Sequence, residues 1–132
     1  MKKILVTGGL GFIGSHCLVE LLNLKKDIIC IDNFLNSTPK VLNQIKKISS
    51  KPFLFKNIGI QSVEINQIFI ENEIDTIIHF AGLKSVEESI AYPEKYFTNN
   101  VIGSKYLFDV AKKFKVNNFI FSSSATVYGN PL

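Results

Sequence analysis

The sequence contains no arginine and no tryptophan, and it has only two cysteines. All 15 basic residues are therefore lysines, and they are scattered along the chain, so the net charge of +4 indicates a solvated surface and not a face that binds nucleic acid. Cys17 and Cys30 have neither a CxxC spacing nor a histidine at ligand spacing, which predicts two buried thiols at core-facing positions. His16 and His79 likewise belong to no cluster with metal-ligand spacing and are expected to pack or hydrogen-bond. These absences predict no metal site and no nucleic-acid partner.

Long hydrophobic runs are also absent. The apolar stretches fall far short of the ~20 residues of a membrane span, and Met1-Lys2-Lys3 leads directly into a predicted strand instead of a signal peptide. We therefore expect a cytoplasmic chain without a membrane partner. The 132 residues contain no internal repeat, low-complexity tract or linker, and this length suits one domain with a substantial core.

A glycine-rich turn lies between an apolar strand at 4–6 and an amphipathic helix that starts near Ile13. Gly8, Gly11 and Gly14 stand where a tight turn, the approach of a pyrophosphate and close helix-on-strand packing each exclude a Cβ. The helix begins beside the anion, so its unpaired N–H groups and positive dipole end can bind phosphate without a basic side chain. The turn is therefore predicted to cradle a diphosphate.

A second strand at 28–31 ends in Asp32, about 20 residues beyond the glycine turn, which is the spacing of the dinucleotide-binding fingerprint. An acidic residue at this place accepts hydrogen bonds from the adenosine ribose and repels a 2′-phosphate. No arginine follows to receive such a phosphate. The predicted cofactor is NAD in preference to NADP.

Strands alternate with helices along the rest of the chain. Further strands are predicted at 53–55, 76–80 and 119–121, and further helices at 39–48, after a cap at Ser62, and over a long stretch interrupted at Pro93. The buried side of that last stretch is predicted to consist of Phe97, Val101, Ser104, Phe108 and Ala111. Continuous apolar strands joined by helices predict an α/β fold of the Rossmann type, with a parallel sheet of order 3-2-1-4-5 and helices on both faces. Ligands of such a sheet bind beyond the carboxyl ends of its strands, where the polar loops of this chain fall.

Several motifs carry a family resemblance. They are TGGLGFIGSH at 7–16, Asp32-Asn33, HFAGLK at 79–84, NNV at 99–101 and SSSATVYG at 122–129. Together they resemble the UDP-glucose 4-epimerases of the extended short-chain dehydrogenase/reductase family, and the resemblance covers the whole chain. It implies NAD as cofactor, a UDP-sugar as substrate in galactose metabolism, and a homodimer for the complete enzyme.

The resemblance also assigns residues. Gly8, Gly11, Phe12, Ile13 and Gly14 would contact the pyrophosphate; Asp32, Asn33, Phe34, Leu35, Asn36 and Ser37 the adenosine ribose and its surroundings; Asn57 and Ile58 the adenine; Phe80, Ala81, Gly82, Leu83, Lys84, Asn99 and Ser122 the rest of NAD. Ser124 would hydrogen-bond the sugar hydroxyl that reacts. The family usually has Asp in place of Asn57. The neutral amide oxygen can still accept a hydrogen bond, but charge-assisted bonds are roughly twice as strong, so weaker NAD binding is expected.

The implied mechanism is oxidation of the sugar at C4, rotation of the 4-keto intermediate, and return of the hydride to its other face. The family's general base is a tyrosine assisted by a lysine four residues later. The four tyrosines, Tyr92, Tyr96, Tyr106 and Tyr128, are followed at that spacing by Tyr96, Asn100, Val110 and Leu132. We therefore interpret residues 1–132 as the incomplete, amino-terminal NAD-binding domain of such an enzyme, with a truncated sheet, and expect it to be inactive alone.

Two other functions stay open. A sugar-nucleotide 4,6-dehydratase typically has an Asp-Glu pair after its serine or threonine, and Ala125-Thr126 stand there instead. A non-catalytic NAD-sensing module could share the fold, since fold does not fix function. Ser124 favours an enzyme, whereas the missing Tyr/Lys pair favours the sensing module.

Overall fold

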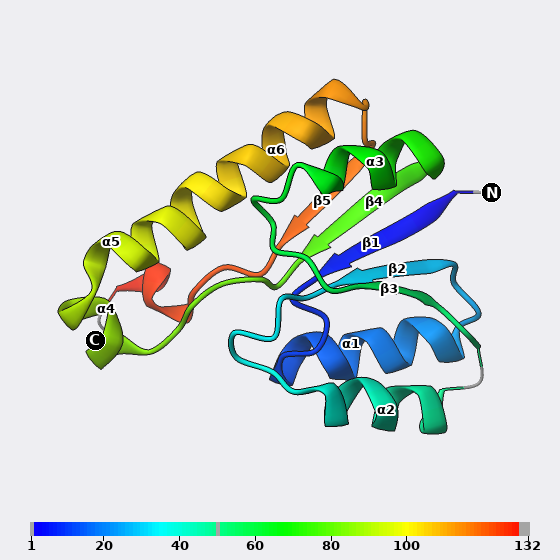
Figure 1. Ribbon diagram of the computed structural model, residues 1–132, viewed down its shortest axis with the longest axis horizontal. Coiled ribbons are helices and arrows are strands. Elements are labelled where there is room, and N and C mark those ends of the chain that lie inside the picture. The colour runs from blue at the N-terminus through cyan, green and yellow to red at the C-terminus, as the bar shows by residue number, and fades with distance from the viewer. Residues whose placement is uncertain (1, 50, 130–132) are drawn as a thin grey trace.

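The computed structural model describes residues 2–49 and 51–129 (Figure 1). One parallel sheet runs through it. Its strands are β1 (Lys3–Thr7), β2 (Ile28–Ile31), β3 (Leu54–Lys56), β4 (Ile74–His79) and β5 (Asn118–Phe121). Their order, β3-β2-β1-β4-β5, confirms the prediction and places the topological switch point between β1 and β4.

Helices cover both faces of the sheet. They are α1 (Phe12–Asn23), α2 (Pro39–Ile48), α3 (Glu64–Glu71), α4 (Val86–Ala91), α5 (Pro93–Tyr96) and α6 (Gly103–Lys113), with a π-helical turn, η1 (Phe97–Ile102), and a 3₁₀ turn, η2 (Ala125–Tyr128). α1 and α2 lie against one face, and α3 and α6 lie against the other (Figure 1). The predicted interruption at Pro93 is confirmed, because Pro93 begins α5 directly after α4 ends. Among the described residues, no helix combines the length and the apolar content that crossing a bilayer requires.

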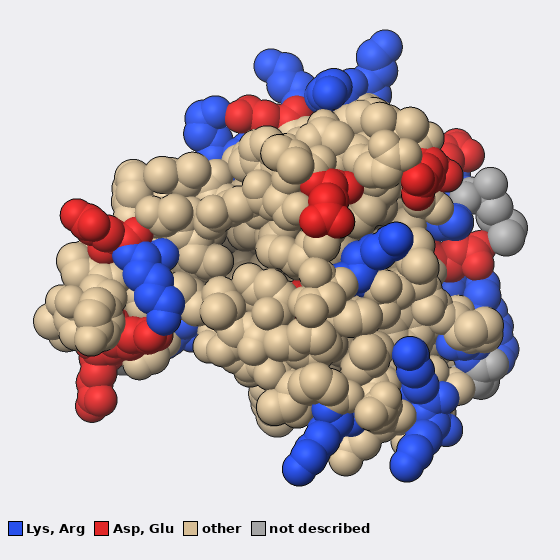
Figure 2. Space-filling model, viewed as in Figure 1, with Lys and Arg blue, Asp and Glu red and all other residues tan. Residues whose placement is uncertain are grey.

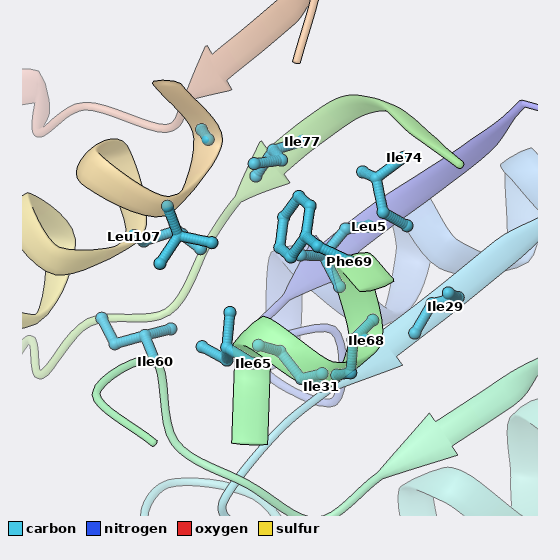
Figure 3. Packing of buried hydrophobic residues seen from close by; sticks show 12 residues of the cluster. Leu5, Ile29, Ile31, Ile60, Ile65, Ile68, Phe69, Ile74, Ile77 and Leu107 are labelled. Carbon is cyan, nitrogen blue, oxygen red and sulfur yellow. The ribbon is translucent and has the colours of Figure 1, made fainter. Parts of the chain in front are cut away.

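The central strands are apolar because the sheet is buried on both faces. Successive side chains point to opposite faces, so Leu5 and Val6 of β1 enter different cores. Leu5 packs in the cluster that contains Phe69 of α3 and Leu107 of α6 (Figure 3). Val6 packs on the other side, in the cluster that contains Leu18 of α1. The two cores together fix the strands whose carboxyl ends carry the polar loops.

The two thiols differ in burial. Cys30 of β2 is fully buried, as predicted, and desolvation raises the pKa of its thiol to about 12. Cys17 of α1 is only half-buried, which corrects the expectation of a core position, although burial still raises its pKa. A raised pKa keeps a thiol protonated and unreactive near neutral pH. Within residues 2–49 and 51–129, no group of three or more acidic, histidine or cysteine side chains could hold a metal ion.

Part of the predicted buried face of the last helix is wrong. Ser104 and Ala111 are buried, but the side chains of Phe97, Val101 and Phe108 are 58%, 51% and 45% exposed. The prediction assumed one uninterrupted α-helical period. The π-turn η1 winds more widely, so the residues before α6 are rotated relative to it.

The face that α6 does bury consists of Gly103, Ser104, Leu107, Val110 and Ala111. Phe108 lies on the flank of this face, where its ring stacks on Phe119 of β5 with centroids 4.1 Å apart. The helix therefore contacts the sheet through its buried face and through Phe108, which stays partly exposed.

The third helix also begins slightly later than predicted. Its N-cap residue is Val63 and its first residue is Glu64. Ser62 still contributes, because its Oγ accepts a hydrogen bond from the Glu64 N–H at 3.2 Å.

A buried polar chain crosses from the sheet to α6. Thr7 Oγ1 lies 2.6 Å from His79 Nδ1, and His79 Nε2 lies 2.9 Å from Ser104 Oγ. His79 is 1% exposed, and desolvation lowers its pKa to about 4, so the imidazole is neutral near pH 7. The residue hydrogen-bonds within the core, as the sequence indicated.

The neutral state of His79 predicts a loss of stability in mild acid. The unfolded chain takes up a proton at this residue near its ordinary pKa of 6.5, whereas the folded chain takes it up only near 4. The free energy of unfolding should therefore fall by about 2 kcal/mol as the pH drops from about 6.5 to 5. Urea unfolding at a series of pH values measures this slope, and a His79→Gln variant should lack it. A slope that is unchanged in the variant would contradict the assignment.

Candidate functional site

A cavity of about 460 Å³ lies at the carboxyl ends of β1, β2 and β4, which is the switch point of the sheet. Its walls are the glycine turn with the start of α1, the loops after β2, β3 and β4, and side chains of α4, α5 and η1. Lysine side chains are spread over the face shown in Figure 2 and do not gather into one basic patch. The cavity lining contains one lysine, Lys84, so an anion in the cavity would depend largely on backbone donors.

The glycine turn is packed too tightly for side chains. Gly8 has a φ of 65°, a left-handed conformation that favours glycine, and a Cβ there would lie 2.6 Å from the backbone nitrogen of Ala81. A Cβ on Gly14 would collide with the carbonyl oxygen of Gly8. Gly11 is the N-cap residue of α1, no side chain caps this terminus, and its first turn lines the cavity. The N–H groups of that turn are therefore available to an anion.

Asp32 ties the glycine turn to the loop after β2. Its Oδ2 accepts a hydrogen bond from the Leu10 N–H at 3.0 Å. Its Oδ1 accepts from the Phe34 N–H at 2.9 Å and from the Ser37 hydroxyl at 2.8 Å. A carboxylate offers about four acceptor sites, so this buried group can still receive one donor from a ligand.

The loop after β4 is held by the side-chain amide of Asn100. Its Oδ1 accepts a hydrogen bond from the Leu83 N–H at 2.8 Å, and its Nδ2 donates to the Leu83 carbonyl at 2.9 Å. Asn99 Nδ2 donates to the same Oδ1 at 2.9 Å. Within the π-turn, Asn99 thus lines the cavity while Asn100 fixes its wall. Asn100 was not predicted as a site residue, although the NNV motif around it was the available clue.

A charged and phenolic cluster forms the α4–α5 side of the cavity. The Tyr96 hydroxyl donates to Glu88 Oε2 at 2.8 Å and accepts from the Ser85 N–H at 3.0 Å. The hydrogen bond from Lys95, followed by that from Tyr96, lowers the pKa of Glu88. Burial, followed by the bond to Glu88, raises the pKa of Tyr96. Near neutral pH the carboxylate is therefore ionised and the phenol is protonated.

Most of the predicted cofactor-binding residues line this cavity. They are Gly8, Gly11, Phe12, Ile13, Gly14, Asp32, Asn33, Leu35, Asn36, Ser37, Ile58, Phe80, Ala81, Gly82, Leu83, Lys84 and Asn99. The lining residues that were not predicted are Ile31, Gly59, Ile60, Ser85, Glu88 and Tyr96. Ile31, Gly59 and Ser85 directly adjoin predicted residues, and Ile60 follows Gly59. Glu88 and Tyr96 lie in a stretch whose helical pattern indicated only packing, and the proximity of α4 to α5 was not visible in the sequence.

Two predicted adenosine contacts lie outside the lining. The Phe34 ring packs on Phe55, with centroids 5.5 Å apart, in the core between the sheet and α1 and α2. Its backbone N–H, which donates to Asp32, is the part nearest the site. Asn57 is exposed and directly precedes Ile58, which does line the cavity.

The two predicted serines also lie outside the lining. Ser122 follows β5, and its N–H donates to the His79 carbonyl at 3.1 Å. Ser124 is exposed and is the N-cap residue of η2, where its Oγ accepts from the Thr126 N–H at 3.2 Å. Ser122 thus extends the pairing of β5 with β4, Ser124 makes a local hydrogen bond, and neither residue lines the cavity.

The profile of the NAD dependent epimerase/dehydratase family matches residues 4–132. Over 129 residues the chain is 52% identical to a UDP-glucose 4-epimerase of Haemophilus influenzae and 49% identical to one of Bacillus subtilis. Each match covers 97% of this chain and 38% of the relative, so the chain spans less than two-fifths of their length.

Two solved structures share the fold closely. The UDP-glucose 4-epimerase of Bifidobacterium longum in complex with NAD+ and UDP has a TM-score of 0.93 and 45% identity, covering 99% of this chain and 39% of that one. The UDP-glucose 4-epimerase of Stenotrophomonas maltophila with bound NAD and formylated UDP-arabinopyranose has a TM-score of 0.92 and 39% identity, covering 98% of this chain and 39% of that one.

The two glycines on opposite walls predict unequal tolerance of a methyl group. Gly14→Ala should lower the free energy of unfolding by about 1–3 kcal/mol, because the new Cβ meets the Gly8 carbonyl and the backbone must shift. Gly82→Ala is the matched control, since its Cβ would lie 3.6 Å from Asn100 Oδ1, an ordinary contact, and should cost less than about 1 kcal/mol. Chemical denaturation of both variants measures the difference. Equal losses would contradict the tight turn.

Proposed function

Because the chain belongs to the NAD dependent epimerase/dehydratase family, we propose that its cavity binds NAD and that residues 1–132 form the NAD-binding domain of a UDP-glucose 4-epimerase. The observation that carries the proposal is a single cavity that joins an uncapped helix N-terminus, behind a glycine turn, to the carboxylate of Asp32. The relatives and similar structures named above support the same reaction, interconversion of UDP-glucose and UDP-galactose, for the whole protein. Its substrate would be a UDP-sugar of galactose metabolism.

Each part of the dinucleotide has a matching wall in this cavity. The start of α1 would donate backbone N–H groups to the pyrophosphate, and Gly8 and Gly14 leave the space for it. The loop from Asp32 to Ser37 would hold the adenosine ribose, and Ile58 would lie beside the adenine. Lys84 and Asn99 would contact the remaining ribose and phosphate groups. When bound, NAD supplies the hydride acceptor.

The same walls favour NAD over NADP. Asp32 is buried and already accepts three protein hydrogen bonds, so it cannot swing away from a phosphate on the ribose. A fixed carboxylate repels such a phosphate electrostatically, and the sequence has no arginine to compensate. A ribose hydroxyl, by contrast, can donate to the acceptor site that remains.

Proton transfer is the step that these residues do not complete. Hydride transfer from the sugar C4 requires that a group accept the proton of the C4 hydroxyl. Ser124, with its own proton in place, can orient or relay that proton but cannot be its net acceptor near neutral pH. Tyr96, which lines the cavity, already donates to Glu88, and its raised pKa opposes the anionic form. We therefore propose that the 132-residue chain is inactive by itself.

The complete enzyme is proposed to be a homodimer. Phe97 and Val101 of η1 and Phe108 of α6 are each about half-exposed in the described chain. Large apolar side chains exposed on adjoining helical segments are typical of surfaces that another polypeptide covers.

Cofactor selection is the first test of the proposal. The 132-residue chain should bind NAD at least about 10-fold more tightly than NADP, because the phosphate would lie against the Asp32 carboxylate. In Asp32→Asn the difference between the NAD and NADP affinities should become smaller, since the negative charge is lost while an acceptor oxygen stays. Asp27→Asn is the matched control, because Asp27 forms a surface ion pair with Lys51 outside the cavity lining. Isothermal titration of the wild type and the two variants measures the three pairs of dissociation constants.

Equal affinity of the wild-type chain for the two dinucleotides would remove the basis of the assignment. An Asp32→Asn variant that keeps the full preference would show that another residue excludes the 2′-phosphate.

Turnover is the second test. The purified 132-residue chain should convert no UDP-galactose to UDP-glucose above the blank when NAD is supplied, because neither Ser124 nor Tyr96 can be the net acceptor of the C4 hydroxyl proton. A coupled assay of UDP-glucose formation measures this, with the full-length Haemophilus influenzae relative as the positive control. Turnover that co-purifies with the chain and is lost in Tyr96→Phe would contradict the argument.

A further inference from the structure

The buried chain of Thr7, His79 and Ser104 connects three walls of the cavity. Thr7 is the last residue of β1 and directly precedes Gly8 of the glycine turn. His79 is the last residue of β4 and directly precedes the wall loop at 80–84. Ser104 lies in the first turn of α6, directly beyond η1, which carries Asn99 and Asn100. All three side chains are buried, and none of them lines the cavity itself.

The hydrogen bonds around Thr7 agree with one direction of this series. Thr7 Oγ1 accepts from the Ala81 N–H at 3.4 Å, which leaves its own proton able to be donated to His79 Nδ1. A neutral imidazole that accepts at Nδ1 carries its proton on Nε2, and that proton would be donated to Ser104 Oγ. In this direction His79 is the Nε2–H tautomer.

The surroundings of the ring keep it in that state. Its ring neighbours are Phe119 and Phe121 of β5, with centroids 6.0 and 5.5 Å away. The side chains from β1, α6 and β5 that contact the ring within the described residues carry no ionisable group. The imidazole is thus a rigid, neutral spacer between β1 and α6.

The spacer acts where the glycine turn and the loop after β4 approach each other closely. Thr7 Oγ1 holds the Ala81 N–H, and the same nitrogen lies opposite Gly8, where a Cβ would come within 2.6 Å. A change of a few tenths of an ångström in the position of Thr7 would therefore alter the separation of the glycine turn from the β4 loop. Gly8 and Ala81 both line the cavity that the proposed dinucleotide would occupy.

We propose that His79 is a positioning residue: as a neutral Nε2–H imidazole it orients Thr7 and, through Thr7, sets the spacing between Gly8 and Ala81 that NAD requires. This role rests on the proposed function. His79 would act from the core behind the cavity wall and would not contact the cofactor.

The first experiment tests the hydrogen bonds of Thr7, His79 and Ser104 in the protein without any cofactor. In the ¹⁵N-labelled protein at pH 7, Nε2 of His79 should show the shift of a protonated ring nitrogen and Nδ1 that of an unprotonated one. In Thr7→Val, which keeps the shape of the side chain but removes the hydroxyl, the Ala81 amide should exchange with solvent at least about 10-fold faster. A proton on Nδ1, or an unchanged exchange rate at Ala81, would overturn the proposal.

The second experiment measures NAD affinity. Thr7→Val should weaken NAD binding about 10-fold and Ser104→Ala about 3-fold, whereas Thr7→Ser, which keeps the hydroxyl, should stay within about 2-fold of the wild type. Thr76→Val is the matched control, because Thr76 lies in the same strand as His79 but far from its carboxyl end, where it bonds to Asp75 and Asn118.

A purely structural role would lower the melting temperature of Thr7→Val and Thr76→Val alike and leave both NAD constants unchanged at temperatures well below melting, which would refute the proposal. If the wild-type protein has the Nε2–H tautomer and the expected amide exchange but binds no NAD, the proposed function is refuted instead. The exchange rate of the Ala81 amide would then still decide whether His79 and Thr7 position the backbone at Ala81.

Discussion

The close approach of two backbones, at Gly8 and Ala81, is the constraint on which the rest of the structure depends. β1 and β4 are paired up to Thr7 and His79, and the chain then leaves both strands side by side with no room for a Cβ at Gly8. A parallel pair can hold such an approach only when both strands are immobile. The two hydrophobic cores provide that immobility, because Leu5 and Val6 anchor β1 from opposite faces of the sheet.

Each wall of the cavity is held by hydrogen bonds from a neighbouring wall. Asp32 accepts the Leu10 N–H of the glycine turn, and Asn100 closes two hydrogen bonds on the backbone of Leu83. A hydrogen bond to a charged group contributes roughly 1.5–3 kcal/mol, and a buried carboxylate without donors would cost more than that. The hydrogen bonds by which Asp32 stabilises the loops also fix the direction of its remaining acceptor site. These hydrogen bonds hold the loops that form the site in fixed positions relative to one another.

The sequence predicted the sheet order and most of the cavity because those features depend on local patterns: apolar runs, a glycine turn and one acidic residue at the end of β2. It failed where a side chain's position depends on the winding of the backbone or on the packing of distant segments. Phe97 and Val101 were assigned to the buried face because a π-turn leaves no signature in hydrophobic spacing. Tyr96 and Glu88 were missed because their contact exists only after α4 folds against α5. Asn100 was missed because an amide that holds a backbone looks the same in sequence as one exposed to solvent.

The cavity and Ser124 lie in separate parts of the structure. Every wall of the cavity comes from segments between Gly8 and Asn99, and these segments are tied to one another by Asp32, Asn100 and the buried chain through His79. Ser124, by contrast, is exposed and held only by η2, outside the cavity lining. The positions of the residues that line the cavity depend on the buried core, whereas the position of Ser124 depends on local hydrogen bonds. The residues that would bind the proposed dinucleotide are therefore fixed by the fold itself, whereas Ser124 is positioned by the hydrogen bonds of η2.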